Sequence, residues 1–268
     1  MSSSLVDAAG YQHSRMDRDA RILSLVPSLT ELLFDLGLAR RLVGRTNFCV
    51  HPNPGVEAIA SVGGTKQIDM DKVAGLNPTH ALVNIDENPK DMADALAEMG
   101  IEVVVTHPFT VTDNVALFRL IGGIFNAGEN AEQLIRDFDS ALADLHAQDW
   151  KSHRVLYLIW RKPWMSISAG TYIADMLAQT NWQVIDHQST ARYPEIDLTN
   201  TLLAQTDLVL FSTEPFPFKL KHLDTFGAEF PAHANKARLI DAEMVSWYGS
   251  RVIAGLRYLA KFAGGVTA

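Results

Sequence analysis

Two stretches of this chain, residues 73–84 and 201–212, repeat one pattern in opposite halves of the sequence. Each has the end of a helix, then a polar break, then a short apolar run that opens into a polar loop containing proline. Between them lies Glu129 to Asp149, which contains no Gly or Pro and has the clearest helical periodicity in the chain. The sequence therefore predicts two similar lobes joined by one helix, with a ligand cleft between the lobes.

Strands alternate with helices on both sides of that helix. Arg21 to Val26 is the first expected strand, and Ser28 or Thr30 then caps a helix that stops at Gly37. Because alternation of this kind implies a mainly parallel sheet, the predicted fold class is α/β, with two such sheets joined by one long rigid helix. Further strands are expected at 42–45, 80–84, 102–106, 154–160, 183–185, 208–212 and 236–241, and further helices at 89–99, 112–126, 171–179, 198–204 and 252–262.

These elements divide the chain into four parts. We expect a disordered leader over residues 1–19, an N-terminal α/β lobe over 20–128, a linking helix over 129–150 and a C-terminal α/β lobe over 151–268. A continuous helix resists bending, so the sequence predicts little movement of the lobes when a ligand binds.

Composition limits the function. The 268 residues are 47% hydrophobic, and the net charge of −8 argues against a nucleic-acid-binding surface. Cys49 is the only cysteine, so this chain alone forms neither a disulfide nor a thiolate metal cage. No apolar run near the start has the length of a signal peptide, and none elsewhere reaches the roughly 20 residues of a membrane span. As written, the sequence predicts a cytoplasmic chain, with localisation left open, and we expect a monomer.

Loops that follow the strands of a parallel sheet gather at one edge, where ligands bind. Here these loops are rich in aromatic and polar residues, which suits a large, flat, partly apolar ligand. Trp164 and Tyr193 stand among Pro and charged residues and are the better ligand candidates. Trp160, Phe216 and Trp247 have a second interpretation, in which they cap the cores of the lobes.

Four histidines fall near predicted strand ends: His51, His80, His107 and His187. No two of them have the local spacing of a ligand pair, so loop or surface histidines are preferred over a direct transition-metal site. The alternative of a direct zinc or manganese receptor, using His51 or His107, stays open.

Signals for an enzyme are poor. Gly63-Gly64-Thr65 lacks the spacing of a nucleotide-binding loop, and Ser168 to Thr171 lacks the flanking glycines of a nucleophile elbow. Cys49 is interpreted as an inert apolar residue. The alternative that stays open is a metal-dependent or carboxylate-based enzyme that uses the same cleft, with Glu214, Glu243 or His107.

Several motifs together resemble one known family. They are the strand, Pro-Ser loop and Thr-Glu helix of residues 21–37, Val62-Gly63-Gly64, Leu76-Asn77-Pro78, Gly100-Ile101, and the segments 160–165, 192–195, 212–218 and 243–251. These are similar to the helical-backbone substrate-binding proteins that serve cobalamin, haem and siderophore uptake by ABC transporters, with the cobalamin binders nearest. The resemblance covers nearly everything after Asp19 and implies the two-lobed fold with one rigid connecting helix.

The resemblance also implies a site and a function. The function is non-enzymatic binding of a corrinoid or related metal chelate, such as cobalamin, haem or a ferric siderophore, by a transporter-type receptor or a cytosolic carrier, with no resident cofactor or metal. At Thr65 the chain departs from the cobalamin binder, which presents a Trp there. The expected ligand-binding residues are Ser28, Phe48, Thr65, Trp164, Tyr193 and Met244 by motif position, with Glu214 and Trp247 from the neighbouring loops.

Members of that family dock on a permease through one carboxylate on each lobe. The N-lobe position falls near Asp71, so Asp71 is the expected docking residue. The C-lobe position falls at Thr199, with Asp197 as the nearest acid. The resemblance therefore implies an ABC permease as a partner, but with the docking carboxylate missing from the C-terminal lobe.

Overall fold

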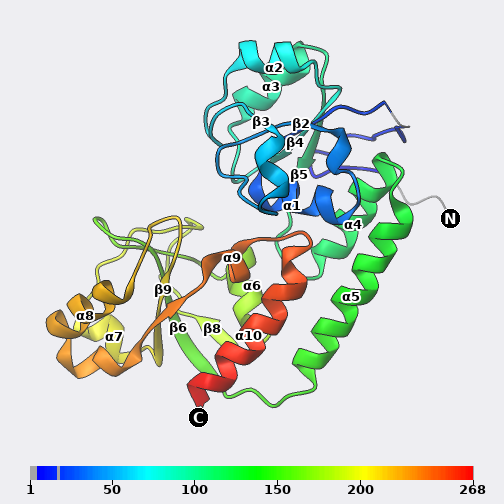
Figure 1. Cartoon of the computed structure of the whole chain (residues 1–268). Helices are drawn as coiled ribbons and strands as arrows, with labels where there is room; N and C mark the ends of the chain where they lie inside the picture. Colours follow the sequence, from blue (N-terminus) through cyan, green and yellow to red (C-terminus); the bar gives the residue numbers. More distant parts are fainter. Residues whose placement is uncertain (1–4, 17–18, 268) are drawn as a thin grey trace. The chain divides into compact units, whose positions relative to one another are not determined.

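The computed structural model describes residues 5–16 and 19–267, drawn in Figure 1. The chain divides into two compact units. Unit 1 comprises Met1–Pro108, Thr112–Phe138 and Tyr248–Arg251, and unit 2 comprises Phe109–Val111, Asp139–Trp247 and Val252–Ala268. Within the described residues, no helix is both long enough and apolar enough to cross a membrane.

Unit 1 is built on a parallel sheet of five strands in the order β3-β2-β1-β4-β5. Its strands are β1 (Ile22–Ser24), β2 (Leu42–Arg45), β3 (Ala60–Ser61), β4 (His80–Asn84) and β5 (Glu102–Thr106). Its helices are α1 (Pro27–Asp35), α2 (Met70–Leu76), α3 (Lys90–Glu98) and α4 (Asp113–Ile124). Leu23, Val73, Ala81 and Leu96 are fully buried between sheet and helices, so apolar burial holds this layer together.

The N-terminal segment differs from the disordered leader that the sequence predicts. The Asp7 side chain is fully buried, and its carboxylate accepts hydrogen bonds from the backbone N–H groups of Ala9, Tyr11 and Val105. The Ala8 N–H donates to the Val105 carbonyl, and the buried His13 ring lies 2.6 Å from Glu102 and 3.1 Å from Asp7. Residues 5–16 therefore lie along the outer edge of β5; residues 1–4, 17 and 18 of the leader lie outside the described residues.

Unit 2 is built on β10 (Ala237–Ile240), β9 (Leu208–Ser212), β6 (His153–Trp160) and β7 (Met165–Ser166), in that order, while β8 (Trp182–Val184) also pairs with β6. All pairings are parallel except that of β7 with β6. The helices are α6 (Tyr172–Ala178), α7 (Asn200–Ala204), α8 (Leu220–Glu229), α9 (Ala242–Ser246) and α10 (Arg251–Thr267). The prediction of an α/β fold with two mainly parallel sheets is confirmed.

Helix α5 (Gly128–His146) is one uninterrupted helix, and its first part belongs to unit 1 and its last part to unit 2. It ends four residues before the predicted linking helix does, where the Trp150 indole N–H donates to the Leu145 carbonyl at 2.9 Å. The chain also passes between the units at the short segments 109–111 and 248–251. The linking helix is thus one of several covalent connections between the units.

The two repeated stretches take matching local structures. Helix α2 leads into β4 and helix α7 leads into β9, and both strands are buried along their whole length. The Asp69 carboxylate caps α2 by accepting from the Lys72 N–H at 3.0 Å, and the Thr199 hydroxyl caps α7 by accepting from the Leu202 N–H at 3.2 Å. The helix at the start of each repeated stretch is therefore capped by a side chain, which is a carboxylate in unit 1 and a hydroxyl in unit 2.

Candidate functional site

In unit 1, a buried asparagine ties together the loops that follow three strands. The Asn88 side-chain amide donates to the Leu25 carbonyl at 3.2 Å and to the Thr65 carbonyl at 2.9 Å, and its oxygen accepts from the Asn84 N–H at 2.8 Å. Thr65, a predicted ligand residue, is therefore held in place through its backbone. The Phe48 ring, another predicted residue, is 59% exposed.

Ser28, at the start of α1, is buried beside a segment that comes from the far end of the sequence. The Gly249 N–H donates to the Asn114 side-chain oxygen at 2.6 Å, and Gly249 has a φ of 79°, which favours glycine. A Cβ at Gly249 would approach the Ser28 carbonyl oxygen to 3.2 Å. The Arg251 guanidinium donates to the Glu31 carboxylate at 2.7 Å, while burial raises the pKa of Glu31 and Arg251 offsets part of that rise.

Tyr248 and Glu87 form a hydrogen-bonded pair that the sequence does not predict. The Tyr248 hydroxyl donates to the Glu87 carboxylate at 2.9 Å. Burial raises the pKa of Tyr248, and the charge of Glu87 raises it further, so the phenol stays neutral and remains the donor. Their positions 161 residues apart in sequence left no local signal that they would meet.

In unit 2, Trp164 is half-buried and packs on the core. Its ring is stacked on Phe218 at 6.1 Å between centroids with an interplanar angle of 8°, and it meets Phe211 edge-on at 6.4 Å. One face of this predicted ligand residue is therefore occupied by the protein. Trp160 is 39% exposed and contacts Phe216 edge-on at 5.6 Å.

Tyr193 belongs to a stack of two aromatic rings and one cation. The Arg192 guanidinium carbon lies 4.8 Å from the Phe109 ring centroid and 5.8 Å from the Tyr193 ring centroid. Both rings are partly open, with Phe109 43% and Tyr193 38% exposed. The stack joins residues from two loops that are far apart in the sequence, and Arg192 is a residue of this stack that the sequence does not predict.

Backbone hydrogen bonds fix this stack. The N–H groups of Ser168 and Ser166 donate to the carbonyls of Arg192 and Pro194 at 2.9 and 3.0 Å. On the Phe109 side, the Val111 N–H donates to the Asp175 carboxylate at 2.7 Å. Because both supporting loops are hydrogen-bonded, the aromatic area is presented at low entropic cost.

The remaining predicted residues of unit 2 lie near α9. The Trp247 indole N–H donates to the Glu214 carboxylate at 2.7 Å, so these two predicted residues are brought together. Met244 is half-buried on α9, and a Cβ at Gly255 of α10 would come within 2.2 Å of the Met244 carbonyl oxygen. That close approach requires glycine at position 255 and sets the position of α9 against α10.

The histidines do not converge. Within residues 5–16 and 19–267, no group of three or more His, Cys, Asp or Glu side chains is arranged to hold a metal ion. His107 lies 3.3 Å from Asp86, and the His187 ring is within 2.9 Å of the Ser166 hydroxyl. His80 is buried at the amino end of β4, away from the edge where the loops gather.

Cys49 is fully buried, and its sulfur accepts a hydrogen bond from the Thr30 hydroxyl at 3.0 Å. Burial raises the pKa of this thiol, so it stays protonated and unreactive.

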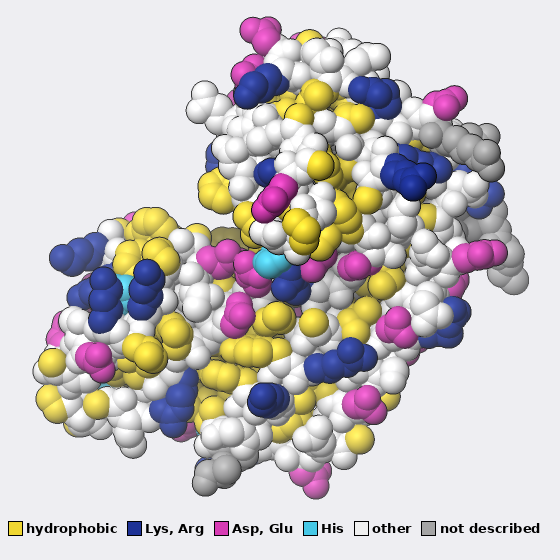
Figure 2. All heavy atoms as spheres, in the orientation of Figure 1, with side chains coloured by type: hydrophobic (Ala, Val, Ile, Leu, Met, Phe, Trp, Pro, Cys, Tyr) yellow, Lys and Arg dark blue, Asp and Glu magenta, His cyan; other side chains and the backbone are white. Residues whose placement is uncertain are grey.

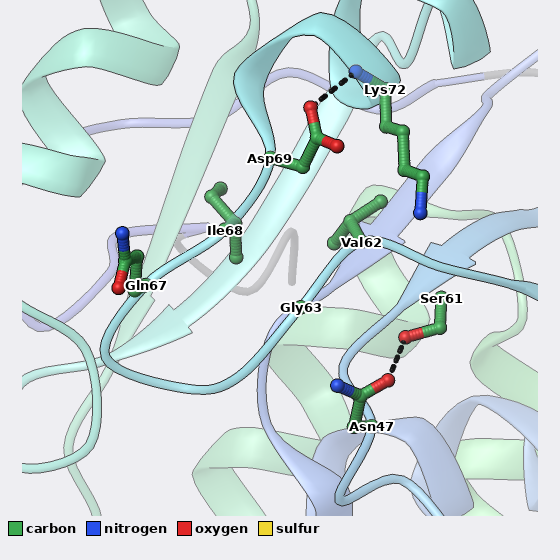
Figure 3. A pocket seen from close by; sticks show the side chains of 8 residues that line it. All are labelled: Asn47, Ser61, Val62, Gly63, Gln67, Ile68, Asp69 and Lys72. Carbon is green, nitrogen blue, oxygen red and sulfur yellow. Dashed lines mark hydrogen bonds between the residues drawn. The ribbon is translucent and has the colours of Figure 1, made fainter.

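A cavity of about 350 Å³ lies beside α2 in unit 1 (Figure 3). Figure 3 shows the Lys72 side chain extending past Val62 towards Ser61, which is hydrogen-bonded to Asn47. None of the predicted ligand residues lines this cavity. The residues that line it are Asn47, Ser61, Val62, Gly63, Gln67, Ile68, Asp69 and Lys72. The expected docking residue, Asp71, is exposed on the first turn of α2.

Comparison with known proteins gives consistent results. The model of a family described as periplasmic binding protein matches residues 22–240. The vitamin B12-binding protein of Pectobacterium atrosepticum is 23% identical over 197 residues, which cover 71% of this chain and 70% of that protein.

Two solved structures have the same fold. The periplasmic vitamin B12-binding protein of Vibrio cholerae superposes with a TM-score of 0.80 at 18% identity, covering 94% of this chain and 99% of that one. The periplasmic haem-binding protein of Roseiflexus sp. RS-1 superposes with a TM-score of 0.77 at 20% identity, covering 94% and 100%.

Proposed function

This chain belongs to the periplasmic binding protein family, and on that premise we propose that it binds a bulky metal chelate without transforming it. The ligand class is that of corrinoids, haem and ferric siderophores. Relatives of similar fold are named for binding vitamin B12 and haem, which supports this class.

The stack of Phe109, Arg192 and Tyr193 is the observation that carries the proposal. It offers two partly exposed aromatic faces on hydrogen-bonded loops, together with a side chain that keeps its positive charge. A flat ligand with apolar faces and polar edges matches both features, because ring contact supplies area and the cation fixes orientation.

We propose that residues of both units contact the ligand. The set is the one expected from the sequence: Ser28, Phe48 and Thr65 from unit 1, and Trp164, Tyr193, Glu214, Met244 and Trp247 from unit 2. Glu214 acts by orienting the Trp247 indole through their 2.7 Å hydrogen bond. Thr65 offers no ring for stacking, so aromatic contact comes mainly from Phe48 in unit 1 and from Phe109, Tyr193 and Trp247 in unit 2.

The test is a titration with four probes: cobalamin, cobinamide, haemin and ferrichrome. Visible absorption and calorimetry should show micromolar or tighter binding of at least one probe, with one equivalent bound. Binding of none of the four would contradict the proposal. Incubation of each bound probe overnight should return it unchanged by chromatography, whereas conversion would favour the enzyme hypothesis.

We further propose that the loaded protein delivers its ligand to an ABC permease through Asp71. Asp71 is exposed next to the Asp69 cap, so two carboxylates lie on the first turn of α2. In unit 2 the matching turn of α7 is capped by the neutral Thr199, and the exposed Asp197 is the nearest acid. Docking charge therefore comes mainly from unit 1. Asp71→Asn should weaken capture by membranes containing the permease and leave ligand affinity unchanged.

A further inference from the structure

Basic residues from two loops of unit 2 meet around one histidine, although they lie about 60 residues apart in the sequence. Arg161 and Lys162 follow β6, and Lys219 and Lys221 flank the start of α8. The Arg161 guanidinium carbon lies 5.6 Å from the Trp164 ring centroid, Trp164 is stacked on Phe218, and Phe218 meets the His222 ring edge-on at 5.6 Å. Burial lowers the pKa of His222, and the charges of Lys221, Arg161 and Lys219 lower it further. Figure 2 shows Lys and Arg side chains gathered around a His over this end of α8.

Aromatic packing holds the two loops together. The Phe216 ring contacts Trp160 at 5.6 Å and His222 at 5.4 Å between centroids, so the rings form a continuous row from one loop to the other. The His222 Nδ1 accepts a hydrogen bond from the Lys219 N–H at 2.8 Å, which fixes the start of α8. The basic residues thus belong to two loops that are held together by packed aromatic rings.

Large apolar side chains are exposed among these charges. Leu220, between the two lysines, is 69% exposed, and Trp160, beside Arg161, is 39% exposed. We call Trp160, Arg161, Lys162, Lys219, Leu220 and Lys221 the basic–apolar patch. It carries four positive charges on a chain whose net charge is −8, so its sign is opposite to that of the whole protein.

We propose that the basic–apolar patch binds the surface of an anionic phospholipid bilayer. Lipid headgroups supply the negative charge for the four cations, and the boundary below them accepts isolated Leu and Trp side chains without needing a matched pocket. An acidic protein would need complementary pockets for Leu220 and Trp160, which makes it the less suitable partner. Binding through this patch concentrates the protein at the membrane and turns this end of unit 2 towards it.

The strength of such binding follows from the charges. Each Lys or Arg close to an anionic bilayer contributes about fivefold in affinity at physiological salt. Two lysines therefore account for about 25-fold. The attraction is screened by salt, so binding weakens steeply between 50 and 500 mM NaCl.

Sedimentation of the full-length protein with vesicles tests the proposal. The vesicles are phosphatidylcholine alone, or phosphatidylcholine with 30% phosphatidylglycerol. We expect binding to the anionic vesicles only, a loss of about 25-fold for K219Q/K221Q, and a loss of about threefold for Leu220→Ser. The matched control K151Q/K261Q removes two exposed lysines from unit 2 and should change binding by less than twofold. Thermal unfolding confirms that each variant is folded.

Three results would overturn the proposal. The first is no binding to anionic vesicles at 50 mM NaCl. The second is an equal loss for the patch variant and for K151Q/K261Q, which would show a diffuse charge effect. The third is displacement by millimolar glycerol phosphate, or tighter binding of soluble poly-glutamate with no effect of Leu220→Ser, which would identify a phosphate site or an acidic protein partner.

Discussion

The repeated stretches of the two units have the same local backbone structure and differ in the side chains they carry. Helix α2 and strand β4 in unit 1 correspond to α7 and β9 in unit 2. The fourth residue of the strand is Val83 in unit 1 and Phe211 in unit 2, and the cap is Asp69 in one and Thr199 in the other. The comparison teaches that the pattern of apolar and polar positions sets the local fold, while side-chain identity sets core size and surface charge.

The largest expected effect comes from the cores. Phe211 is fully buried against Phe218 and Phe226, at 5.2 and 5.4 Å between ring centroids, whereas Val83 packs in an aliphatic core. Phe211→Ala should lower the free energy of unfolding by about 4 kcal/mol and Val83→Ala by about 2 kcal/mol. Urea unfolding measures both. Equal losses of unfolding free energy would mean that Phe211 and Val83 contribute equally to the cores of their units.

The second effect concerns ligand affinity. Tyr193 of unit 2 is held beside Arg192 on a hydrogen-bonded loop and is 38% exposed, whereas Phe48 of unit 1 is 59% exposed. Tyr193→Ala should weaken binding of the best probe about tenfold and Phe48→Ala about threefold, because a ring already in place loses less entropy on binding. Calorimetry measures the two dissociation constants. Tyr193→Phe, which keeps the ring, serves as the control.

Removal of the helix caps should have a smaller effect, and the effect should be similar in the two units. Asp69→Ala and Thr199→Ala each remove one side-chain acceptor from a helix start, so each should cost about 1 kcal/mol of unfolding free energy. The reciprocal change Thr199→Asp keeps the cap and adds a carboxylate to α7. It should leave urea unfolding nearly unchanged, and a loss above about 1 kcal/mol would contradict the equivalence of the two starts.

The smallest effect is on pH dependence. Burial lowers the pKa of His80 in unit 1 and of His153 and His187 in unit 2. Because the folded-state pKa lies below the ordinary value near 6.5, the contribution of each neutral ring to stability is fully present when the pH is above about 6.5. This contribution is lost as the pH falls through the folded-state pKa. Unfolding midpoints should therefore fall from pH 7 to pH 5, and His80→Gln and His187→Gln should each flatten part of the slope. An unchanged slope in both variants would show that other groups cause it.

Much of the fold followed from the sequence, because the strands are short apolar runs and the helices have ordinary caps. The strands β4 and β9 and the capped helices α6 and α7 fall close to their predicted ranges. Helix α8 was missed: it begins after Lys219, which is not a typical cap residue, and it follows a proline-containing loop. The anchored N-terminal segment was missed because Asp7 and His13 hold it through polar contacts that leave no hydropathy period.

The site was only partly predictable for a related reason. The loops that carry it could be located, since they follow strands of a parallel sheet. The pairings within each unit, such as Tyr248 with Glu87 in unit 1 and Arg192 with Phe109 in unit 2, join residues that are far apart in sequence and have no shared motif. The same holds for the basic–apolar patch, whose four cations occur as two short, separate runs.

The segment along β5 has a practical consequence for anyone preparing this protein. β5 is the last strand of its sheet, and residues 5–16 cover its outer side through Ala8 and Asp7. A version trimmed to residue 19 would leave that row of amides and carbonyls open to pairing with another molecule. Such a shortened protein should form concentration-dependent aggregates, and shielding against self-association is thus a task of residues 5–16.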